Sequence, residues 1–176
     1  LGKTLAVWLG PVSEWLDENR RDAALGEADC SDASDGATEP VRTLWITPLR
    51  ALAGDTVKAL REPVEALGMP WTIEQRTGDT SASVKARQRM KLPTCLVTTP
   101  ESLSLILSQD RAKGLLSTLR AVVVDEWHEL LSSKRGSQTE LALARLRAWQ
   151  PDLRVWGMSA TIANLDEAAR SLAGST

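Results

Sequence analysis

Short, unbroken apolar runs recur along this chain and alternate with stretches of helical character, and this alternation restricts the possible folds more than any other feature. The runs occupy residues 43–47, 71–73, 94–99, 121–124 and 155–158. Consecutive apolar residues, in place of an alternating pattern, predict strands that are buried on both faces. Strands of this kind are typical of parallel sheets that are covered by helices on both sides.

The stretches between these runs predict helices, and prolines mark several of their limits. Pro11 and Pro63 fall inside two of the stretches and are expected to kink or end the helices there. Pro100 suits the first turn of a helix, and Asn164, with Glu167 three positions later, suits the N-cap of another. Repeated strand–helix units predict an α/β domain with a mainly parallel β-sheet flanked by helices on both faces. The expected helices cover residues 5–15, 51–67, 81–90, 101–107 and 138–149.

Residues 19–40 differ from the rest of the chain, because they are rich in Asp, Glu, Ala, Ser and Gly and contain almost no large apolar side chain. We expect a flexible, solvated acidic loop here, within the domain. An acidic arm that binds a partner is the less favoured alternative. The chain starts at Leu1 and not at Met, so we also expect a domain over residues 1–176 that is incomplete at its N-terminus and part of a longer protein.

Composition and charge exclude several classes of protein. Lys and Arg number 21 against 23 Asp and Glu, a net charge of -2, so any contact with nucleic acid must be local. Two cysteines, Cys30 and Cys95, and one histidine, His128, are too few for a structural zinc site or a disulfide scaffold. This cysteine content fits a cytoplasmic protein. No apolar run approaches the ~18 residues of a transmembrane helix, so no membrane association is expected.

The segment Gly2-Lys3-Thr4 precedes a predicted helix and matches the end of the phosphate-binding loop G-x-x-x-x-G-K-[ST]. Backbone N–H groups at such a helix start hold phosphate oxygens. Lys3 would reach the outer phosphates of ATP, and the hydroxyl of Thr4 would hold Mg²⁺. Three residues often match by chance, so the alternative is an ordinary helix start that contains a lysine.

Asp125 and Glu126 directly follow the most apolar run and open the sequence D-E-W-H. Ligands of open α/β sheets bind outside the carboxyl ends of the strands. Asp125 could help to hold Mg²⁺ on nucleotide phosphates, and Glu126 could orient or deprotonate the attacking water. A solvated strand end is the alternative for this motif alone. Together with Lys3 and Thr4, the two carboxylates predict a Mg-ATP site.

With these motifs, the chain resembles the motor domain of superfamily 2 helicases of the DExH type over essentially all 176 residues. Gly2-Lys3-Thr4 and D-E-W-H match motifs I and II, and Ser159-Ala160-Thr161 matches motif III. The Trp of motif II and segments 129–136 and 161–165 are most similar to the large helicase-related family, and within it to ligase-associated DEXH-box helicases. Motifs Ia, Ib and Ic match residues 47–52, 77–79 and 99–103.

This resemblance implies the first of two RecA-like P-loop domains, which uses ATP and Mg²⁺ to move along single-stranded DNA, 3′-to-5′ and in DNA repair. It implies a second RecA-like domain of the same chain and a DNA ligase as partners. Alone, this chain is expected to be largely inactive, because an arginine finger from the second domain is worth ~10³–10⁵ in turnover. An RNA helicase of the DExH type and a P-loop small-molecule kinase are the alternatives, although the kinase does not explain motif III.

The resemblance also assigns coupling residues and nucleic-acid contacts. His128, Ser159 and Thr161 would couple the nucleotide site to the nucleic acid and to the second motor domain. Turn or cap chemistry is the alternative for each predicted contact. The basic run of Lys85, Arg87, Arg89 and Lys91 could contact DNA, but charges spread around a helix usually face water. The implied contacts to the sugar-phosphate backbone come from Thr47, Arg50, Thr77, Gly78, Thr99 and Ser102.

Overall fold

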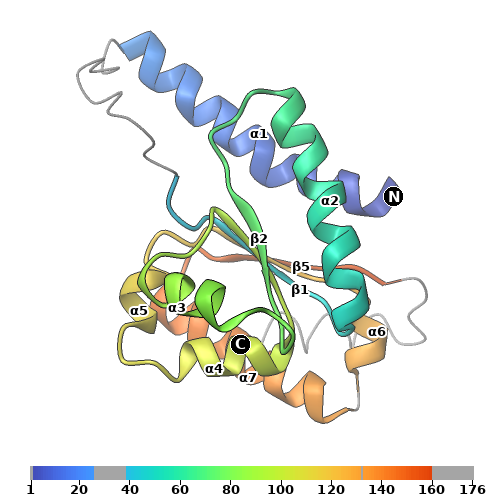
Figure 1. The fold of residues 1–176 in the computed structure, drawn as a ribbon. Coiled ribbons are helices and arrows are strands. Elements are labelled where there is room, and N and C mark those ends of the chain that lie inside the picture. The colour runs from blue at the N-terminus through green and yellow to red at the C-terminus, as the bar shows by residue number, and fades with distance from the viewer. Residues whose placement is uncertain (1, 26–38, 132, 160–176) are drawn as a thin grey trace.

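The computed structural model describes residues 2–25, 39–131 and 133–159, which form a parallel five-stranded sheet with helices on both faces (Figure 1). The strand order is β2-β3-β1-β4-β5, and every neighbouring pair is parallel. The α/β fold expected from the sequence is therefore confirmed. The strands are β1 (Thr43–Ile46), β2 (Ile73–Arg76), β3 (Cys95–Thr98), β4 (Ala121–Val124) and β5 (Arg154–Gly157).

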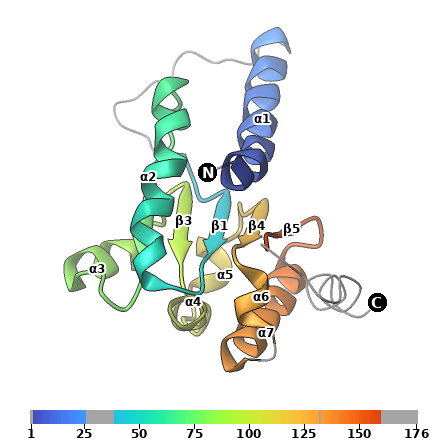
Figure 2. The same cartoon turned by 90° about the vertical axis from the view of Figure 1, so that its right-hand side faces the viewer.

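Helices cover the sheet in two layers (Figure 2). One layer contains α1 and α2, and the other contains α4, α6 and α7, while α3 lies at the β2 edge of the sheet. No helix in the described part of the chain is long and apolar enough to cross a bilayer. The helices are α1 (Gly2–Leu25), α2 (Arg50–Ala66), α3 (Ala82–Met90), α4 (Pro100–Leu107), α5 (Ala112–Leu115), α6 (Trp127–Leu130) and α7 (Lys134–Trp149).

Hydroxyl side chains cap three of these helices at their first turns. Ser81 accepts a hydrogen bond from the N–H of Val84 at the start of α3, and Thr99 does the same for Ser102 in α4. Ser133 accepts the N–H of a glycine in the first turn of α7. A side-chain cap of this kind stabilises a helix by ~1 kcal/mol, because it satisfies an N–H group that has no partner within the helix.

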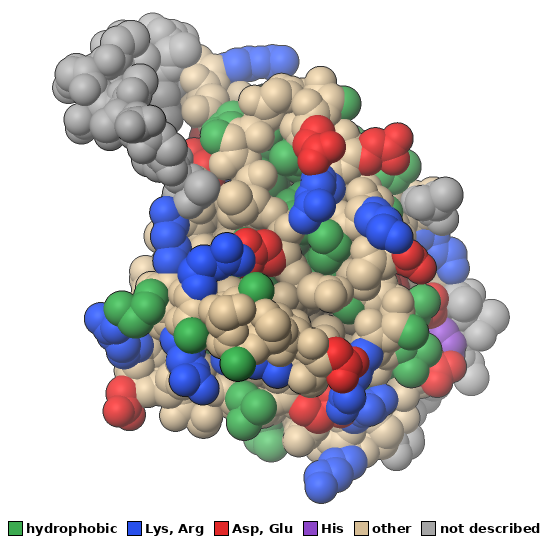
Figure 3. All heavy atoms as spheres, in the orientation of Figure 1, with side chains coloured by type: hydrophobic (Ala, Val, Ile, Leu, Met, Phe, Trp, Pro, Cys, Tyr) green, Lys and Arg blue, Asp and Glu red, His purple; other side chains and the backbone are tan. Residues whose placement is uncertain are grey.

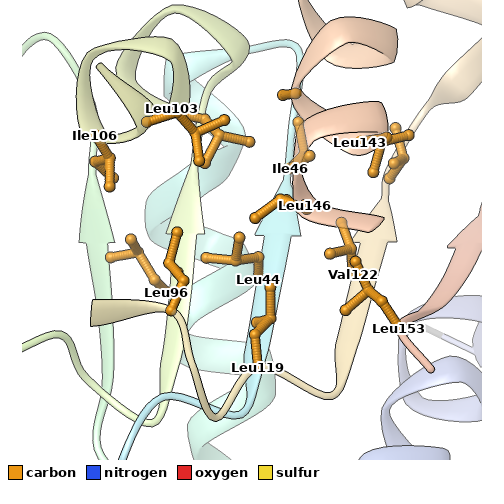
Figure 4. Packing of buried hydrophobic residues seen from close by; sticks show 14 of the residues in the cluster. Leu44, Ile46, Leu96, Leu103, Ile106, Leu119, Val122, Leu143, Leu146 and Leu153 are labelled. Carbon is orange, nitrogen blue, oxygen red and sulfur yellow. The ribbon is translucent and has the colours of Figure 1, made fainter. Parts of the chain in front are cut away.

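The two layers create two separate cores, because successive residues of a strand face opposite sides of the sheet. Leu44 and Ile46 of β1 pack against α4 and α7, whereas Trp45 between them packs against α1 and α2. Figure 4 shows the first core, in which Leu44 and the neighbouring strand residues Leu96 and Val122 lie among leucines of the covering helices. Burial on both sides explains why the strands appear in the sequence as unbroken apolar runs.

Tryptophans supply much of the core between α1 and the sheet, where the chain has neither Phe nor Tyr to use. Trp8 lies edge-on to Trp45, with ring centroids 6.3 Å apart, and edge-on to Trp71 at 5.6 Å. Trp15 contacts Trp71 in the same way at 6.1 Å. The indole N–H of Trp8 donates to the carbonyl of Leu60 at 3.0 Å, which joins α1 to α2. Edge-to-face pairs add ~0.5–1.5 kcal/mol each beyond the apolar area they bury.

Pro11 and Pro63 lie inside α1 and α2 and end neither helix, so the helix ends expected at these prolines are wrong. The alternative expectation, a kink at each proline, stays a prediction. The buried residues Trp8 and Val12 hold the turns on both sides of Pro11, so tertiary packing offsets the lost backbone hydrogen bond. The same packing acts around Pro63, where Leu60 and Val64 are buried.

The predicted acidic loop over residues 19–40 is also wrong at its start, because α1 continues through Leu25. Arg, Ala and Leu make up five of the seven residues 19–25, and no Gly or Pro occurs between Pro11 and Gly26. These residue types favour a helix that is already nucleated by packing. Residues 26–38, and the helix expected after Asn164, lie outside the described residues.

The first turn of α7 passes so close to the end of α6 that only glycine fits at residue 136. A Cβ on Gly136 would overlap the carbonyl oxygen of Leu130 and lie 2.9 Å from its carbonyl carbon. We expect Gly136→Ala to lower the free energy of unfolding by ~1–3 kcal/mol. Gly114→Ala in α5 is the control, because its Cβ would meet no atom within 4 Å. Denaturant unfolding of both variants measures the difference, and a Gly136→Ala midpoint equal to that of wild type would contradict the close approach.

Candidate functional site

The strands share a register that brings their carboxyl ends to one edge of the sheet. Ile46 at the end of β1 pairs with Thr98 of β3 and with Val124 of β4. Arg76 of β2 and Gly157 of β5 end their strands at the same level. The residues that follow the strands therefore meet at this edge, which is where open α/β sheets bind their ligands.

One cavity of about 630 Å³ at this edge brings together the two motifs predicted to bind the nucleotide. The start of α1 contributes Lys3 and Thr4, and the end of β4 contributes Asp125 and Glu126. The cavity has the size of a typical small-molecule site, ~300–1,000 Å³. Its lining residues are Gly2, Lys3, Thr4, Leu52, Asp55, Thr56, Ala59, Asp125, Glu126, Met158 and Ser159.

Asp125 is held at the end of β4 by backbone hydrogen bonds. Its own N–H donates to the carbonyl of Ile46 at 2.8 Å, and its carboxylate oxygen Oδ1 accepts the N–H of Glu126 at 2.9 Å. Burial raises the pKa of Asp125, and the N–H of Glu126 and the charge of Lys3 oppose this shift only in part. A carboxylate in this setting is stabilised by any cation that enters the cavity.

Glu126 has a left-handed backbone conformation, with φ 45° and ψ 48°, and among the described residues it is the one non-glycine residue with positive φ. Such a conformation costs ~1–3 kcal/mol and is typical of functional sites. The next residue holds it in place, because the N–H of Trp127 donates to the carbonyl of Met158 at 2.8 Å and its side chain is fully buried. The buried oxygen Oε2 of Glu126 accepts no hydrogen bond within the described structure and lies 3.4 Å from Nδ1 of His128.

Ser159, which follows β5, connects the two motifs. Its hydroxyl lies 3.0 Å from Nδ1 of His128, and its carbonyl accepts a hydrogen bond from Nζ of Lys3 at 3.2 Å. His128 also has its other ring nitrogen 3.4 Å from Glu129. The structure thus brings together two of the three predicted coupling residues, and the third, Thr161, lies outside the described residues.

The cavity has the donors that a magnesium-bound nucleotide requires. The hydroxyl of Thr4 and the carboxylate of Asp125 line the same space, and hard cations such as Mg²⁺ prefer oxygen ligands. Lys3 supplies a positive charge at the helix start, where backbone N–H groups favour phosphate. These residues fit Mg²⁺ together with phosphate groups.

Three of the predicted nucleic-acid contacts lie together beyond the ends of β2 and β3. Thr77, Gly78 and Ser102 line a second cavity of about 370 Å³. Arg50 lies beside them, because a Cβ on Gly78 would come within 2.9 Å of its guanidinium carbon. The guanidinium is half-exposed and is 3.5 Å from the carboxylate of Asp79, so it is available for a stronger anionic partner.

Thr47 and Thr99 have a different place. Neither lines the second cavity, and both are buried, Thr47 completely. The hydroxyl of Thr47 donates to the carbonyl of Leu49, and that of Thr99 caps α4 and donates to Ser102. Turn and cap chemistry accounts for both side chains, and contact of either residue with nucleic acid stays a prediction.

Arg135 was not predicted as a site residue, although the structure places it between two of the predicted nucleic-acid segments. It donates to the carbonyl of Pro48 at 3.0 Å and to the carboxylate of Glu101. Burial opposes ionisation of Glu101, but hydrogen bonds from its backbone N–H, Thr99 and Arg135 outweigh it and lower its pKa. A single sequence offered no signal for this bridge, because its three members are far apart in the chain.

The second cavity adds three basic residues that were not predicted as site residues, although contact with DNA was left open for two of them, Lys85 and Arg89. Arg76 ends β2, and Lys85 and Arg89 come from α3. The charges of this helix were expected to face water. The available signal was the spacing of four residues between Lys85 and Arg89, which places both side chains on one face of the helix.

Asp125 gives a prediction about stability. Its raised pKa means that the folded chain holds more protons than the unfolded chain between the ordinary carboxyl pKa of ~3.9 and the raised value. Stability therefore falls as pH rises through this window. Asp125→Asn keeps the acceptor for the N–H of Glu126 and removes the charge. It should raise the free energy of unfolding at neutral pH, without nucleotide or metal.

The gain should disappear at pH values below ~3.9, where the wild-type carboxyl is protonated in both states. Denaturant titrations of the variant and wild type at both pH values provide the measurement, with the acidic pair as the internal control. An equal gain at both pH values would show that packing, and not charge, is responsible.

Comparisons with known proteins agree with this geometry. The ATP-dependent helicase Lhr-Core of Methanothermobacter thermautotrophicus is 37% identical over 98% of this chain and 20% of its own length. The structure of the Mycobacterium smegmatis helicase Lhr bound to ssDNA and AMP-PNP is similar over 77% of this chain and 19% of that chain, with 36% identity and a TM-score of 0.68. The DEAD-box helicase Mss116 bound to ssRNA and UDP-BeF shares the fold, with 18% identity and a TM-score of 0.67 over 76% of this chain and 28% of that chain.

The resemblance to superfamily 2 helicases inferred from the motifs is confirmed, and so is its closer similarity to the large helicase-related (Lhr) proteins. The chain spans about a fifth of the length of the Lhr-Core helicases it matches. Residues 1–168 match the family described as DEAD/DEAH box helicase, and this chain therefore belongs to that family.

Proposed function

We propose that this chain is the first RecA-like motor domain of an ATP-dependent helicase of the Lhr type, which moves 3′-to-5′ along single-stranded DNA in repair. One observation carries the proposal: the Lys3–Thr4 helix start and the Asp125–Glu126 pair line a single cavity at the carboxyl edge of the sheet. The exposed guanidinium of Arg50 and the second cavity lie beyond strands of the same edge. The relative that was solved with ssDNA and AMP-PNP supports the choice of both ligands.

Each side chain of the cavity has a distinct task in the proposed reaction. Lys3 binds the outer phosphates, and Thr4 and Asp125 hold Mg²⁺, which when bound neutralises part of the phosphate charge. Glu126 orients a water molecule and accepts its proton while the water oxygen bonds to the γ-phosphorus and the bridging oxygen leaves with ADP. The buried Oε2 atom of Glu126, which accepts no hydrogen bond in the described structure, suits this task.

The proposal includes coupling between the nucleotide site and the bound nucleic-acid strand. His128 and Ser159 are in contact, and Ser159 also accepts from Lys3, so a change at the phosphates reaches the end of β5 directly. Thr161 belongs to the same proposed group. A second RecA-like domain supplies the arginine finger and the other half of the strand-binding surface. A cytoplasmic location and association with a DNA ligase complete the proposal, and an RNA strand is its alternative.

Glu126→Gln in the full-length protein should abolish ATP turnover and leave ATP and DNA binding largely intact. The amide has nearly the size of the carboxylate but is a much poorer base, so the chemical step fails while the ground state survives. Asp125→Asn is the matched variant, because it removes the charge that holds Mg²⁺ and should weaken nucleotide binding as well. Phosphate release and nucleotide affinity are measured for both. Normal turnover by Glu126→Gln, or equal losses of affinity in both variants, would refute the assigned roles.

Arg50→Ala should weaken binding to single-stranded DNA of every sequence by about the same factor, because phosphate contacts do not read bases. The slope of log affinity against log salt should fall by ~0.7 for one lost phosphate contact on a single strand. Arg20→Ala, on the distant half of α1, removes the same charge without touching this edge and should leave the slope unchanged. Titrations of several oligonucleotides over a range of salt concentrations provide the measurement. A loss confined to one sequence would indicate base readout.

A further inference from the structure

The second cavity has a strongly basic lining. It lies between α3, α4 and the end of β2, and three of its side chains are cationic: Arg76, Lys85 and Arg89. No carboxylate lines it. In Figure 3, Lys and Arg side chains gather over the flank of the molecule where Figure 1 places α3. The remaining lining residues are Thr77, Gly78, Ser102, Leu105 and Gln109.

Arg76 is the most unusual member of this lining, because it is a buried cation that makes no ion pair with any residue that the structure describes. The residue is 5% exposed, and its Nη1 atom is buried with no hydrogen-bond partner within the described structure. Burial lowers the pKa of Arg76, and the nearby charge of Arg89 lowers it further. A buried charge of this kind is destabilising unless an anion pairs with it.

The acidic residue nearest in the chain is already used elsewhere. One carboxylate oxygen of Glu74 binds Arg87 at 2.7 Å, and the other accepts the side-chain amide of Gln88 at 2.9 Å. Arg87 therefore has a partner in β2 and does not line the cavity, whereas Arg89 makes no ion pair with any described residue. The free positive charge is thus concentrated on the side of α3 that lines the cavity.

The chemistry of the walls selects the ligand. Guanidinium groups and hydroxyls are the usual partners of phosphate oxygens, and Thr77 and Ser102 add hydroxyls to the cations. Leu105, which is 66% exposed, adds an apolar wall to the cavity. An apolar wall beside a phosphate site suits the sugar or base of a nucleic-acid strand better than free inorganic phosphate.

We infer that this cavity, the Arg76 pocket, binds one backbone phosphate of the tracked strand, and that Arg76, Lys85 and Arg89 are strand-binding residues in addition to those of the motifs. The inference rests on the proposed function. Gly78 connects the pocket to the predicted contacts, because its carbonyl accepts from Nζ of Lys85 at 2.7 Å while the guanidinium of Arg50 packs against its α-carbon. Arg50 and the pocket therefore hold neighbouring parts of one strand.

Arg89→Gln in the full-length protein tests the inference, because Arg89 is exposed and its loss should not disturb folding. Affinity for a single-stranded oligonucleotide should fall for all sequences, and the slope of log affinity against log salt should fall by ~0.7. Arg87→Gln is the matched control on the same helix, because it removes the same charge from outside the pocket and should keep the wild-type slope. Arg76→Gln should reproduce the effect of Arg89→Gln where circular dichroism shows that the variant is folded.

A second measurement distinguishes binding of the nucleic-acid strand from binding of a free anion. Inorganic phosphate is titrated against the melting temperature of wild type and Arg89→Gln. A phosphate-dependent rise that Arg89→Gln abolishes, with an unchanged salt slope for DNA, would overturn the inference in favour of a free-anion site. Equal slopes for Arg89→Gln, Arg87→Gln and wild type would also overturn it and leave the motor function standing. A wild-type protein that binds no strand would overturn both proposals.

Discussion

The burial of β4 on both faces is the constraint on which the rest of this structure depends. Val122 and Val124 pack against one helical layer, and Val123 packs against the other. A strand in this position has no place for a charged side chain along its length, because an unpaired charge between two apolar layers would cost far more than any hydrogen bond returns. Polar chemistry is therefore confined to the point where the strand ends, and the shared register of β1, β3 and β4 brings several such points together.

The strain at Glu126 follows from the same arrangement. The chain must leave β4 and turn at once into the short α6, whose Trp127 is buried in the core, and the left-handed conformation of Glu126 achieves this turn in one residue. The ~1–3 kcal/mol that this conformation costs is offset by the burial of Trp127 and by its hydrogen bond to Met158. The result is a carboxylate that a rigid turn directs to the cavity, so little reorganisation is needed when a ligand arrives.

Sequence reasoning succeeded where one physical effect dominates and failed where several compete. The central strands were predicted because both faces of β1, β3 and β4 are apolar. The edge strand β2 was placed too early, at residues 71–73, because the polar residues Glu74 and Gln75 interrupt the apolar run. Gln88 of α3 donates to the side chain of Glu74 and to the backbone carbonyl of Gln75. The nucleotide motifs were found because each is contiguous. The Arg76 pocket and the Arg135 bridge were missed, because they form only when strand order brings separate segments together.

Ser159 shows how such a sheet edge can transmit a signal over a short distance. In the described structure the ammonium group of Lys3 is bound to the carbonyl of Ser159, and the hydroxyl of the same residue contacts His128. A phosphate oxygen carries more negative charge than a carbonyl oxygen and makes a stronger hydrogen bond to an ammonium group. Under the proposed function, the arriving nucleotide therefore competes with Ser159 for Lys3 and releases the end of β5 from α1. Binding at the phosphates and the position of this segment are then linked by one exchange of hydrogen bonds, without any rearrangement of the buried strands.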